Sequence, residues 1–266
     1  MDMTGKSVLV TGAASGLGRA TALRYAAYGA AKVACLDIHD EGNAETAAMI
    51  RDQSAEAFAV HVDLGDVDSI GSAYGEALAQ LGRLDAAAHI GGYSWRGGSL
   101  DVTKAHWDTV MNVNLRGTFF CCQQALKAMY GQKRGAIVNM SADAAFFPVH
   151  GFAVQAAGKG GVALMTRTFG LEAARRGVRV NAVSPGNVIV QHTGASWAER
   201  PPLKPEDNAP SPAGSIEELA AQMAPGRFIE AEEVANVFVF FSSDAASGIS
   251  GQTISVNGGG YYAMQL

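Results

Sequence analysis

Between an apolar run and a helix-like segment, the chain reads Thr11-Gly12-Ala13-Ala14-Ser15-Gly16-Leu17-Gly18. The glycine spacing is G-x-x-x-G-x-G, and glycines there allow a tight turn whose backbone N–H groups approach a pyrophosphate at a helix N-terminus. Gly-rich turns also occur for purely structural reasons, but this one follows an apolar run, opens a helix and has an acidic residue about 20 positions later. The stretch therefore predicts a dinucleotide-binding turn, with phosphate contacts from Gly12, Ser15, Gly16, Leu17 and Gly18.

The acidic residue is Asp37, at the end of the apolar run Lys32–Asp37. A carboxylate at that place accepts hydrogen bonds from an adenosine ribose and repels a 2′-phosphate. Ala14 is not basic, so the turn offers such a phosphate no partner, and we expect NAD(H) in preference to NADP(H). The structural alternative is that Asp37 only caps the next helix.

A second carboxylate follows the third apolar run, in Asp63-Leu64. At this place it could lie near the adenine amino group. A solvated loop aspartate is the alternative.

Short apolar runs alternate with helical segments along the whole chain, which predicts a doubly wound parallel α/β sheet. The expected strands are Ser7–Thr11, Lys32–Asp37, Ala57–Asp63, Asp85–Ile90, Ala136–Ser141, Arg179–Ser184 and Thr253–Asn257. The expected helices cover 16–29, 41–54, 67–81, 103–131, 152–176 and 231–242. Strands that are apolar throughout are typical of a sheet covered on both faces.

Composition excludes several classes of protein. The net charge of −5 argues against a nucleic-acid partner, whose binding surface would be basic. No apolar run approaches the roughly 20 residues that span a bilayer, and residues 1–11 lack the pattern of a secretory signal. The three cysteines, Cys35, Cys121 and Cys122, form neither a disulfide framework nor a metal motif. We therefore expect a cytoplasmic protein without a metal site.

One segment breaks the alternation. Residues 187–228 hold six of the eight prolines, and proline disfavours both helix interiors and central strands. A loop of this length within a compact domain is usually functional. We interpret it as a substrate lid, and a disordered excursion is the alternative.

The chain resembles the short-chain dehydrogenase/reductase family over essentially all of its length. The resemblance rests on the Gly-rich turn, Asp37 and Asp63, and on Asn112-Val113-Asn114-Leu115-Arg116-Gly117, Lys159-Gly160-Gly161, Asn181-Ala182-Val183-Ser184-Pro185-Gly186 and Asn257-Gly258-Gly259. It implies a single-domain Rossmann fold over residues 1–266, with a nicotinamide cofactor also held by Pro185, Gly186, Val188 and Lys159. It further implies a homo-oligomer, commonly a tetramer, in which the helices near 103–131 and 152–176 form a four-helix dimer interface. Adjacent positions on a helix point in different directions, so packing is the favoured role of Cys121 and Cys122.

The catalytic positions depart from the family. Its chemistry usually rests on an Asn, a Ser, a Tyr and a Lys, of which Asn114 and Lys159 match. The Tyr position, four residues before the Lys, holds Gln155, and the Ser position holds Ala142. Ser141 is adjacent, but one step along an extended chain turns a side chain to the other face.

Gln155 cannot act as a general acid or base because its amide has no accessible pKa, and losing such a group typically costs about 10²–10⁴-fold in rate. The family's usual Asn-Asn-Ala-Gly after the fourth strand has also become His89-Ile90-Gly91-Gly92, and Val190 replaces a usual Thr. These further changes argue against engineered inactivation.

Substitute groups exist, each with a structural alternative. His150 precedes Gln155 by five residues and could pass protons, or it could be a residue of the rim. Asp143 is either an active-site carboxylate or a loop cap. For His89, hydrogen bonding to the backbone is favoured over chemistry. Tyr93, Trp95 and Trp197 could line an apolar pocket for a small-molecule substrate, although ordinary packing explains each equally well.

Three functions follow from these observations. The leading one is an NAD(H)-dependent oxidoreductase that acts on a small alcohol or ketone with a non-standard catalytic set of Lys159, Asn114, Gln155 and His150. A non-redox isomerase or lyase on the same scaffold is the second. A non-catalytic subunit is the third.

Overall fold

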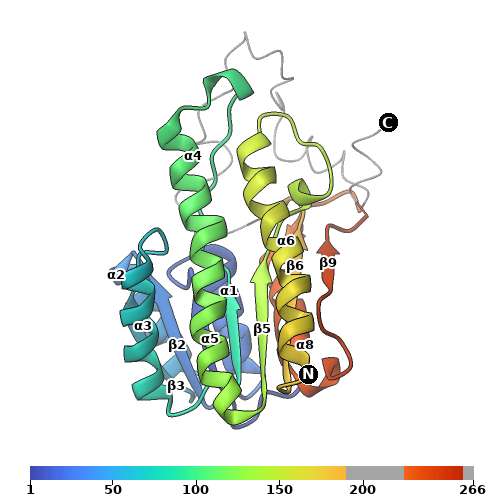
Figure 1. Ribbon diagram of the computed structural model, residues 1–266. Helices are drawn as coiled ribbons and strands as arrows, with labels where there is room; N and C mark the ends of the chain where they lie inside the picture. The colour runs from blue at the N-terminus through green and yellow to red at the C-terminus, as the bar shows by residue number, and fades with distance from the viewer. Residues whose placement is uncertain (190–224, 260–266) are drawn as a thin grey trace.

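The fold is a three-layer α/β domain, and the computed structural model describes residues 1–189 and 225–259 (Figure 1). Seven parallel strands form the central sheet in the order β3-β2-β1-β4-β5-β6-β9. Most of the segment expected to form a lid, residues 190–224, lies outside the described residues. The predicted fold class, a doubly wound parallel sheet of seven strands, is confirmed.

The seven predicted strands are all present, two of them with the predicted ends and the others with ends that differ by at most two residues. They are β1 (Ser7–Thr11), β2 (Lys32–Asp37), β3 (Glu56–His61), β4 (Ala86–His89), β5 (Gly135–Met140), β6 (Val178–Pro185) and β9 (Thr253–Val256). A parallel pair outside the main sheet, β7 (Val188–Ile189) with β8 (Ile229–Glu230), was not predicted. This pair joins the chain just before residues 190–224 to the chain just after them.

The helices also follow the prediction, with one correction. They are α1 (Gly16–Ala27), α2 (Asp40–Arg51), α3 (Val67–Leu81), α4 (Lys104–Val110), α5 (Thr118–Gln132), α6 (Ala153–Ala174) and α8 (Ala231–Ser242). The helix expected over 103–131 is an uninterrupted helical run over residues 104–132, but its middle, η2 (Met111–Gly117) between α4 and α5, is a π-helical turn. Short 3₁₀ turns are η1 (Ser99–Asp101), η3 (Asp143–Ala145) and η6 (Asp244–Ala246).

The core forms two apolar layers, one on each face of the sheet. Successive side chains of a strand point to opposite faces, and accordingly Val8 and Val10 of β1 join one layer while Leu9 joins the other. The first layer packs against α1, α2 and α8, and the second against α3, α5 and α6 (Figure 1).

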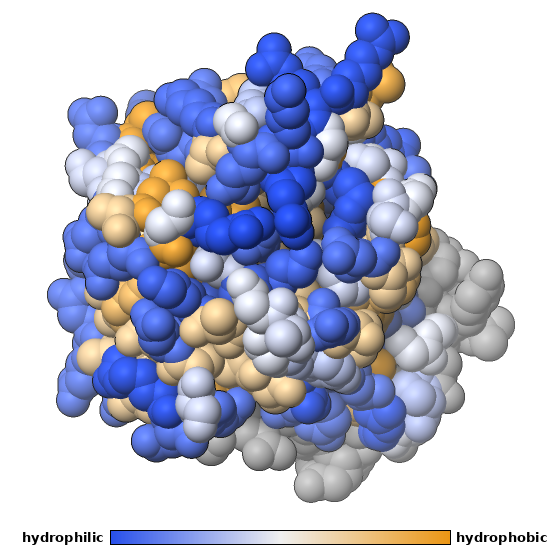
Figure 2. Space-filling model, turned by 90° about the horizontal axis from the view of Figure 1, so that it is seen from below, coloured by the Kyte–Doolittle hydropathy of each residue, from blue (hydrophilic) through white to orange (hydrophobic). Residues whose placement is uncertain are grey.

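β1 and β4 are neighbours in the sheet. From β1 the chain continues to β2 and β3 on one side, and from β4 it continues to β5, β6 and β9 on the other, so the strand order reverses between β1 and β4. In open α/β sheets, ligands bind beside such a point at the carboxyl ends of the strands. Figure 2 shows the opposite end of the molecule, where polar residues are mixed with scattered apolar ones. Within the described residues, no helix is long and apolar enough to cross a membrane.

Candidate active site

The Gly-rich turn, residues 11–18, joins β1 to α1. Gly12 has a φ of +74°, a conformation that favours glycine. A Cβ on Gly18 would lie 1.8 Å from the Gly12 carbonyl oxygen, so a side chain there is excluded. The N-cap residue Ser15 makes no side-chain hydrogen bond to the first turn of α1. The first-turn N–H groups therefore suit an anionic ligand, and the turn fits a pyrophosphate.

Asp37 lies beside this turn and holds it in place. Its carboxylate accepts hydrogen bonds from the backbone N–H groups of Ala14 and His39, each at 3.0 Å. The alternative role as a helix cap is not observed, because the N-cap of α2 is His39. Each carboxylate oxygen retains acceptor capacity for a further donor such as a ribose hydroxyl.

Arg19, which the sequence interpretation passed over, lies on the other side of the turn. Its guanidinium donates to the carbonyl oxygens of Ala14 (2.6 Å) and Gly42 (3.0 Å) and pairs with Glu45 at 2.9 Å. Its position directly after Gly18 was the available signal. The Arg19 guanidinium, directly after the turn, thus already forms a hydrogen bond and an ion pair with residues of α2.

The loop after β3 also approaches the site. Asp63 accepts a hydrogen bond from the Gly65 N–H at 2.7 Å. Leu64 fills the space between the loop after β4 and η2, since a Cβ on Gly91 would lie 2.5 Å from its Cδ1 and one on Gly117 would lie 2.4 Å from its carbonyl oxygen. Asp63 and Leu64 therefore lie, like the Gly-rich turn, at the carboxyl ends of the strands.

The structure brings together three of the four predicted catalytic residues. Asn114, buried in the π turn η2, donates from Nδ2 to the Tyr93 carbonyl oxygen at 2.7 Å and to Gln155 Oε1 at 3.2 Å. Its Oδ1 accepts from the Tyr93 N–H at 2.9 Å. Lys159 lies one turn after Gln155 in α6, and both side chains are buried.

The Lys159 ammonium group donates to the Met140 carbonyl oxygen at 2.8 Å. Burial lowers the pKa of Lys159 to about 8, because the charged form is poorly solvated. A Cβ on Gly92 would lie 2.8 Å from Asn114 Oδ1 and 3.5 Å from Lys159 Nζ, so the bare backbone of Gly92 borders this cluster. The site therefore holds a cation that can lose its proton near neutral pH.

Ser141 does not substitute for the missing hydroxyl at Ala142. It is buried, and its Oγ donates to the Lys159 carbonyl oxygen at 3.0 Å. This contact supports the backbone of α6, in agreement with the expectation that its side chain points to the other face.

His89 is a buried, hydrogen-bonded residue of the core. Its Nδ1 lies 2.8 Å from Asn139 Oδ1, and its Nε2 lies 2.7 Å from the Tyr74 hydroxyl. Asn139 Nδ2 donates to Thr166, which leaves Oδ1 as the acceptor from His89. Burial lowers the pKa of His89 to about 4, so the ring is neutral at pH 7. The hydrogen-bonding interpretation is correct, with side-chain partners in place of the expected backbone.

Asp143 joins the ends of three strands. Its carboxylate accepts from Ser184 Oγ at 3.0 Å and from Asn257 Nδ2 at 2.7 Å. A Cβ on Gly186 would lie 3.1 Å from its Oδ2. Asp143 thus braces Pro185-Gly186, two of the expected cofactor residues, while Val188 lies two residues further on in β7.

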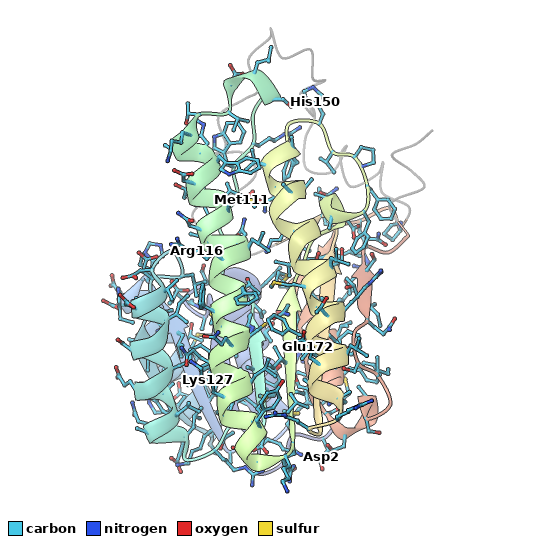
Figure 3. All side chains as sticks on the ribbon, in the orientation of Figure 1. Asp2, Met111, Arg116, Lys127, His150 and Glu172 are labelled. Carbon is cyan, nitrogen blue, oxygen red and sulfur yellow. The ribbon has the colours of Figure 1, made fainter. Side chains whose placement is uncertain are left out.

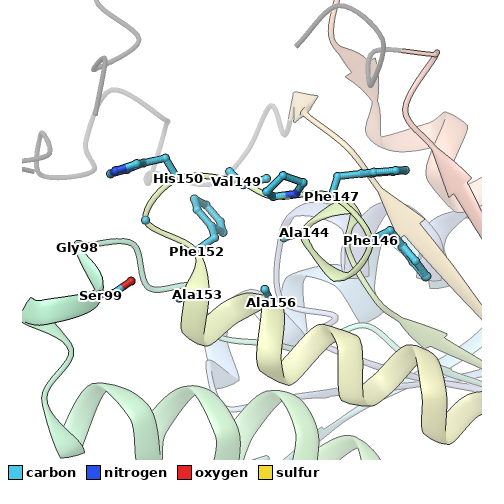
Figure 4. Close-up of a pocket in the computed structure, with 12 residues that line it drawn as sticks. Gly98, Ser99, Ala144, Phe146, Phe147, Val149, His150, Phe152, Ala153 and Ala156 are labelled. Atoms are coloured by element: carbon cyan, nitrogen blue, oxygen red, sulfur yellow. The ribbon is translucent and has the colours of Figure 1, made fainter. Parts of the chain in front are cut away.

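His150 is not part of the buried cluster. It is exposed in the loop that precedes α6, at the opposite end of the molecule from Asp2 (Figure 3). It lines a cavity of about 560 Å³ between η3, the start of α6 and the loop after β4 (Figure 4). Trp95 stacks on His106 with centroids 4.6 Å apart, and Trp197 lies outside the described residues.

The described part of the chain contains no group of three or more His, Cys, Asp or Glu side chains that could hold a metal ion. All three cysteines are buried, and burial raises the pKa of the Cys35 and Cys122 thiols to about 12. Cys121 and Cys122 belong to the apolar layer under α5.

Comparison with known proteins agrees with this geometry. A family model described as enoyl-(acyl carrier protein) reductase matches residues 12–261. The chain is 35% identical to the 3-oxoacyl-(acyl-carrier-protein) reductase FabG of Staphylococcus aureus over 98% of this chain and 100% of the relative. It is 33% identical to the D-threitol dehydrogenase of Mycolicibacterium smegmatis, over 97% and 93% of the two chains. The crystal structure of levodione reductase superimposes with a TM-score of 0.86 at 30% identity, covering 99% of this chain and 100% of that one.

Proposed function

Because the chain belongs to the short-chain dehydrogenase/reductase family, we propose that it is an NAD(H)-dependent oxidoreductase of small alcohols and ketones with a non-standard catalytic set. The observation that carries the proposal is the buried cluster of Asn114, Gln155 and Lys159, which lies beside a turn shaped for a dinucleotide.

The cofactor residues are proposed from the geometry of the turn. Gly12, Ser15, Gly16, Leu17 and Gly18 would contact the pyrophosphate, and Asp37 would accept hydrogen bonds from the adenosine ribose. The Asp37 carboxylate repels a 2′-phosphate, and Arg19 already pairs with Glu45. Both features favour NAD(H). Asp63, Leu64, Pro185, Gly186 and Val188 complete the proposed site.

When bound, the dinucleotide would supply or accept the hydride. The protein must then transfer a proton to or from the substrate oxygen. Gln155 Oε1 already accepts from Asn114, so its Nε2 amide is the half that donates to that oxygen. Lys159 provides a cation for the ribose hydroxyls. Its position on α6 is fixed by its hydrogen bond to Met140 and by that of Ser141.

The proton itself must come from a side chain that can donate one, or from water. Lys159 is the first candidate because burial lowers its pKa to about 8, and ordered water beside Asn114 would connect it to the substrate. His150, exposed at the adjacent cavity, is the second candidate.

We also propose one domain over the whole chain, with a substrate lid at about 187–228 whose base is closed by the β7–β8 pair. A homo-oligomer, specifically a tetramer, is proposed from the outer face of η2, α5 and α6. That face holds a groove of about 600 Å³ lined in part by Met111, Leu115 and Phe119, and it leaves Leu164 65% exposed. An apolar face of this kind marks a protein contact.

The first test is a titration with NADH and NADPH followed by nicotinamide fluorescence. Tight binding of NADH with weak binding of NADPH supports the proposal, and no binding of either cofactor overturns it.

The second test restores the usual catalytic groups in the variant Ala142→Ser/Gln155→Tyr. If the cluster is a weakened redox site, ketone reduction in this variant rises by about 10²–10⁴-fold. Gln155→Ala is the matched control, and it lowers the activity because the donor to the substrate oxygen is lost. A restored variant that binds NADH but gains no hydride transfer would count against a redox site.

A further inference from the structure

A cavity of about 560 Å³ lies at the start of α6, the helix that carries Gln155 and Lys159 (Figure 4). Its lining comes from η3 and the loop after it, from the first turns of α6, and from Gly98-Ser99 after β4. The volume lies within the range of about 300–1,000 Å³ that is typical of small-molecule sites.

The described lining of the cavity is aromatic and uncharged. Phe146, Phe147 and Phe152 contribute rings, and Phe146 is 42% exposed although it is a large apolar side chain. Ser99 and His150 contribute the polar side chains, and the lining within the described residues includes no Lys, Arg, Asp or Glu. Arg96 packs over Phe152 with its guanidinium 5.6 Å from the ring centroid, and it does not belong to the lining.

Two residues of the cavity wall lie next to catalytic positions along the chain. Ala156, in its wall, directly follows Gln155, and Ala144 lies two residues after Ala142. A substrate whose oxygen meets the Gln155 amide would pass close to this wall, because Gln155 and Ala156 both lie in the first turn of α6. His150 marks the outer edge, with its ring directed away from Ala156 (Figure 4).

We propose that this cavity selects an uncharged alcohol or ketone with an aromatic or alicyclic body, an inference that rests on the proposed oxidoreductase function. Such a body replaces water against the apolar lining, which is favourable. A polyol would lose hydrogen bonds to water and find, among the described lining residues, only the Ser99 and His150 side chains as partners, and unmade hydrogen bonds are costly. A phosphate-bearing thioester would find no cation in the described lining. The proposed substrate therefore differs from those that the names of the FabG and threitol dehydrogenase relatives suggest.

Binding to the complete chain tests this directly. We would measure the affinity of 2-acetylnaphthalene, D-threitol and acetoacetyl-coenzyme A by isothermal titration calorimetry, adding NAD⁺ with the two carbonyl probes and NADH with D-threitol. A ketone and NAD⁺ cannot exchange a hydride, and neither can an alcohol and NADH, so binding is observed without turnover. The ketone should bind at least about 100-fold more tightly than either polar probe.

Variants locate the binding. Phe146→Ala should weaken binding of the ketone by about tenfold, because one apolar wall is lost. Phe152→Leu, which keeps an apolar side chain in case truncation impairs folding, should weaken it by a smaller factor. Leu100→Ala is the matched control, since Leu100 is fully exposed beside Ser99 and outside the lining, and it should leave the affinity unchanged.

The outcomes separate this inference from the proposed function. Ketone binding that depends on Phe146, without oxidation of NADH in a separate assay, upholds the inference about the cavity and overturns the oxidoreductase. Turnover of threitol or acetoacetyl-coenzyme A without ketone binding upholds the oxidoreductase and overturns the inference. Ketone binding unaffected by Phe146→Ala and Phe152→Leu also overturns it.

Discussion

The buried His89 makes stability depend on pH in a way that one substitution can isolate. In the folded protein its pKa is lowered to about 4 by burial, whereas in the unfolded chain it has the ordinary value near 6.5. Between these values the unfolded chain binds the proton and the folded protein does not. Stability is therefore intact above about pH 6.5 and is lost progressively as the pH falls toward 4.

The magnitude follows from the two pKa values. The two pKa values differ by about 2.5, and a difference of one in pKa corresponds to about 1.4 kcal/mol. The free energy of unfolding therefore falls by about 3 kcal/mol once His89 is protonated in both the folded and the unfolded state. Only part of this loss develops between pH 7 and pH 5, and it amounts to about 2 kcal/mol. That is a large fraction of the 5–15 kcal/mol, roughly, by which a domain is stable.

Urea unfolding at pH 7 and at pH 5, at one protein concentration, measures this loss in the wild type and in His89→Asn. Asparagine keeps an amide beside Asn139 but does not titrate. The variant should be about 1–3 kcal/mol less stable at pH 7 because the contact with Tyr74 is lost, and its decline toward pH 5 should be about 2 kcal/mol smaller than that of the wild type. His61→Asn, an exposed histidine at the end of β3, is the matched control. Equal declines in wild type and His89→Asn would refute the reasoning.

Three further predictions concern the site. Gly18→Ala places a Cβ 1.8 Å from the Gly12 carbonyl oxygen, so the affinity for NADH, measured by fluorescence, should fall by at least about 100-fold. Gly75→Ala is the comparison variant in α3, where a Cβ meets nothing within 4 Å. It should raise the free energy of unfolding in urea by about 0.5–1 kcal/mol. Asp37→Ser removes the charge that repels a 2′-phosphate, so the ratio of NADPH to NADH affinity should rise by about tenfold, and an unchanged ratio would contradict the role of Asp37. Lys159→Met should raise stability by up to about 3 kcal/mol and weaken NADH binding, whereas in the wild type NADH affinity should decline above about pH 8 as the ammonium deprotonates.

The order and type of nearly every helix and strand could be predicted because they depend on local patterns. Apolar runs such as Ser7–Thr11 are buried on both faces, and the parallel arrangement of the sheet follows from the alternation of strands and helices. The ends of the strands were predicted to within two residues because Gly and polar residues bound the runs. The π turn at Met111–Gly117 was not predictable in this way, since it changes the hydrogen-bond register of an otherwise ordinary helical sequence.

The site was predictable where it depends on spacing within one element, and not where partners are distant in sequence. Gln155 and Lys159 are one helical turn apart, so their proximity follows from the sequence. The partner of His89 is Asn139, 50 residues away, and that of Asp143 is Asn257, 114 residues away. Neither contact leaves a local signal, which is why the roles of both residues stayed open until the structure placed them.

The cost of burying Lys159 bears on whether this site still binds a ligand. A pKa of about 8 in place of the ordinary 10.4 means that the folded protein loses about 3 kcal/mol by holding the ammonium in an apolar setting at pH 7. One hydrogen bond to Met140 contributes only about 1.5–3 kcal/mol in return. A purely structural α6 would be at least as stable with an unbranched apolar residue there. The cation is therefore best explained by a bound partner with oxygen acceptors, such as ribose hydroxyls. A protein that only retained the scaffold would gain stability from Lys159→Met and lose no affinity, whereas a cofactor-binding enzyme would gain the stability and lose the cofactor.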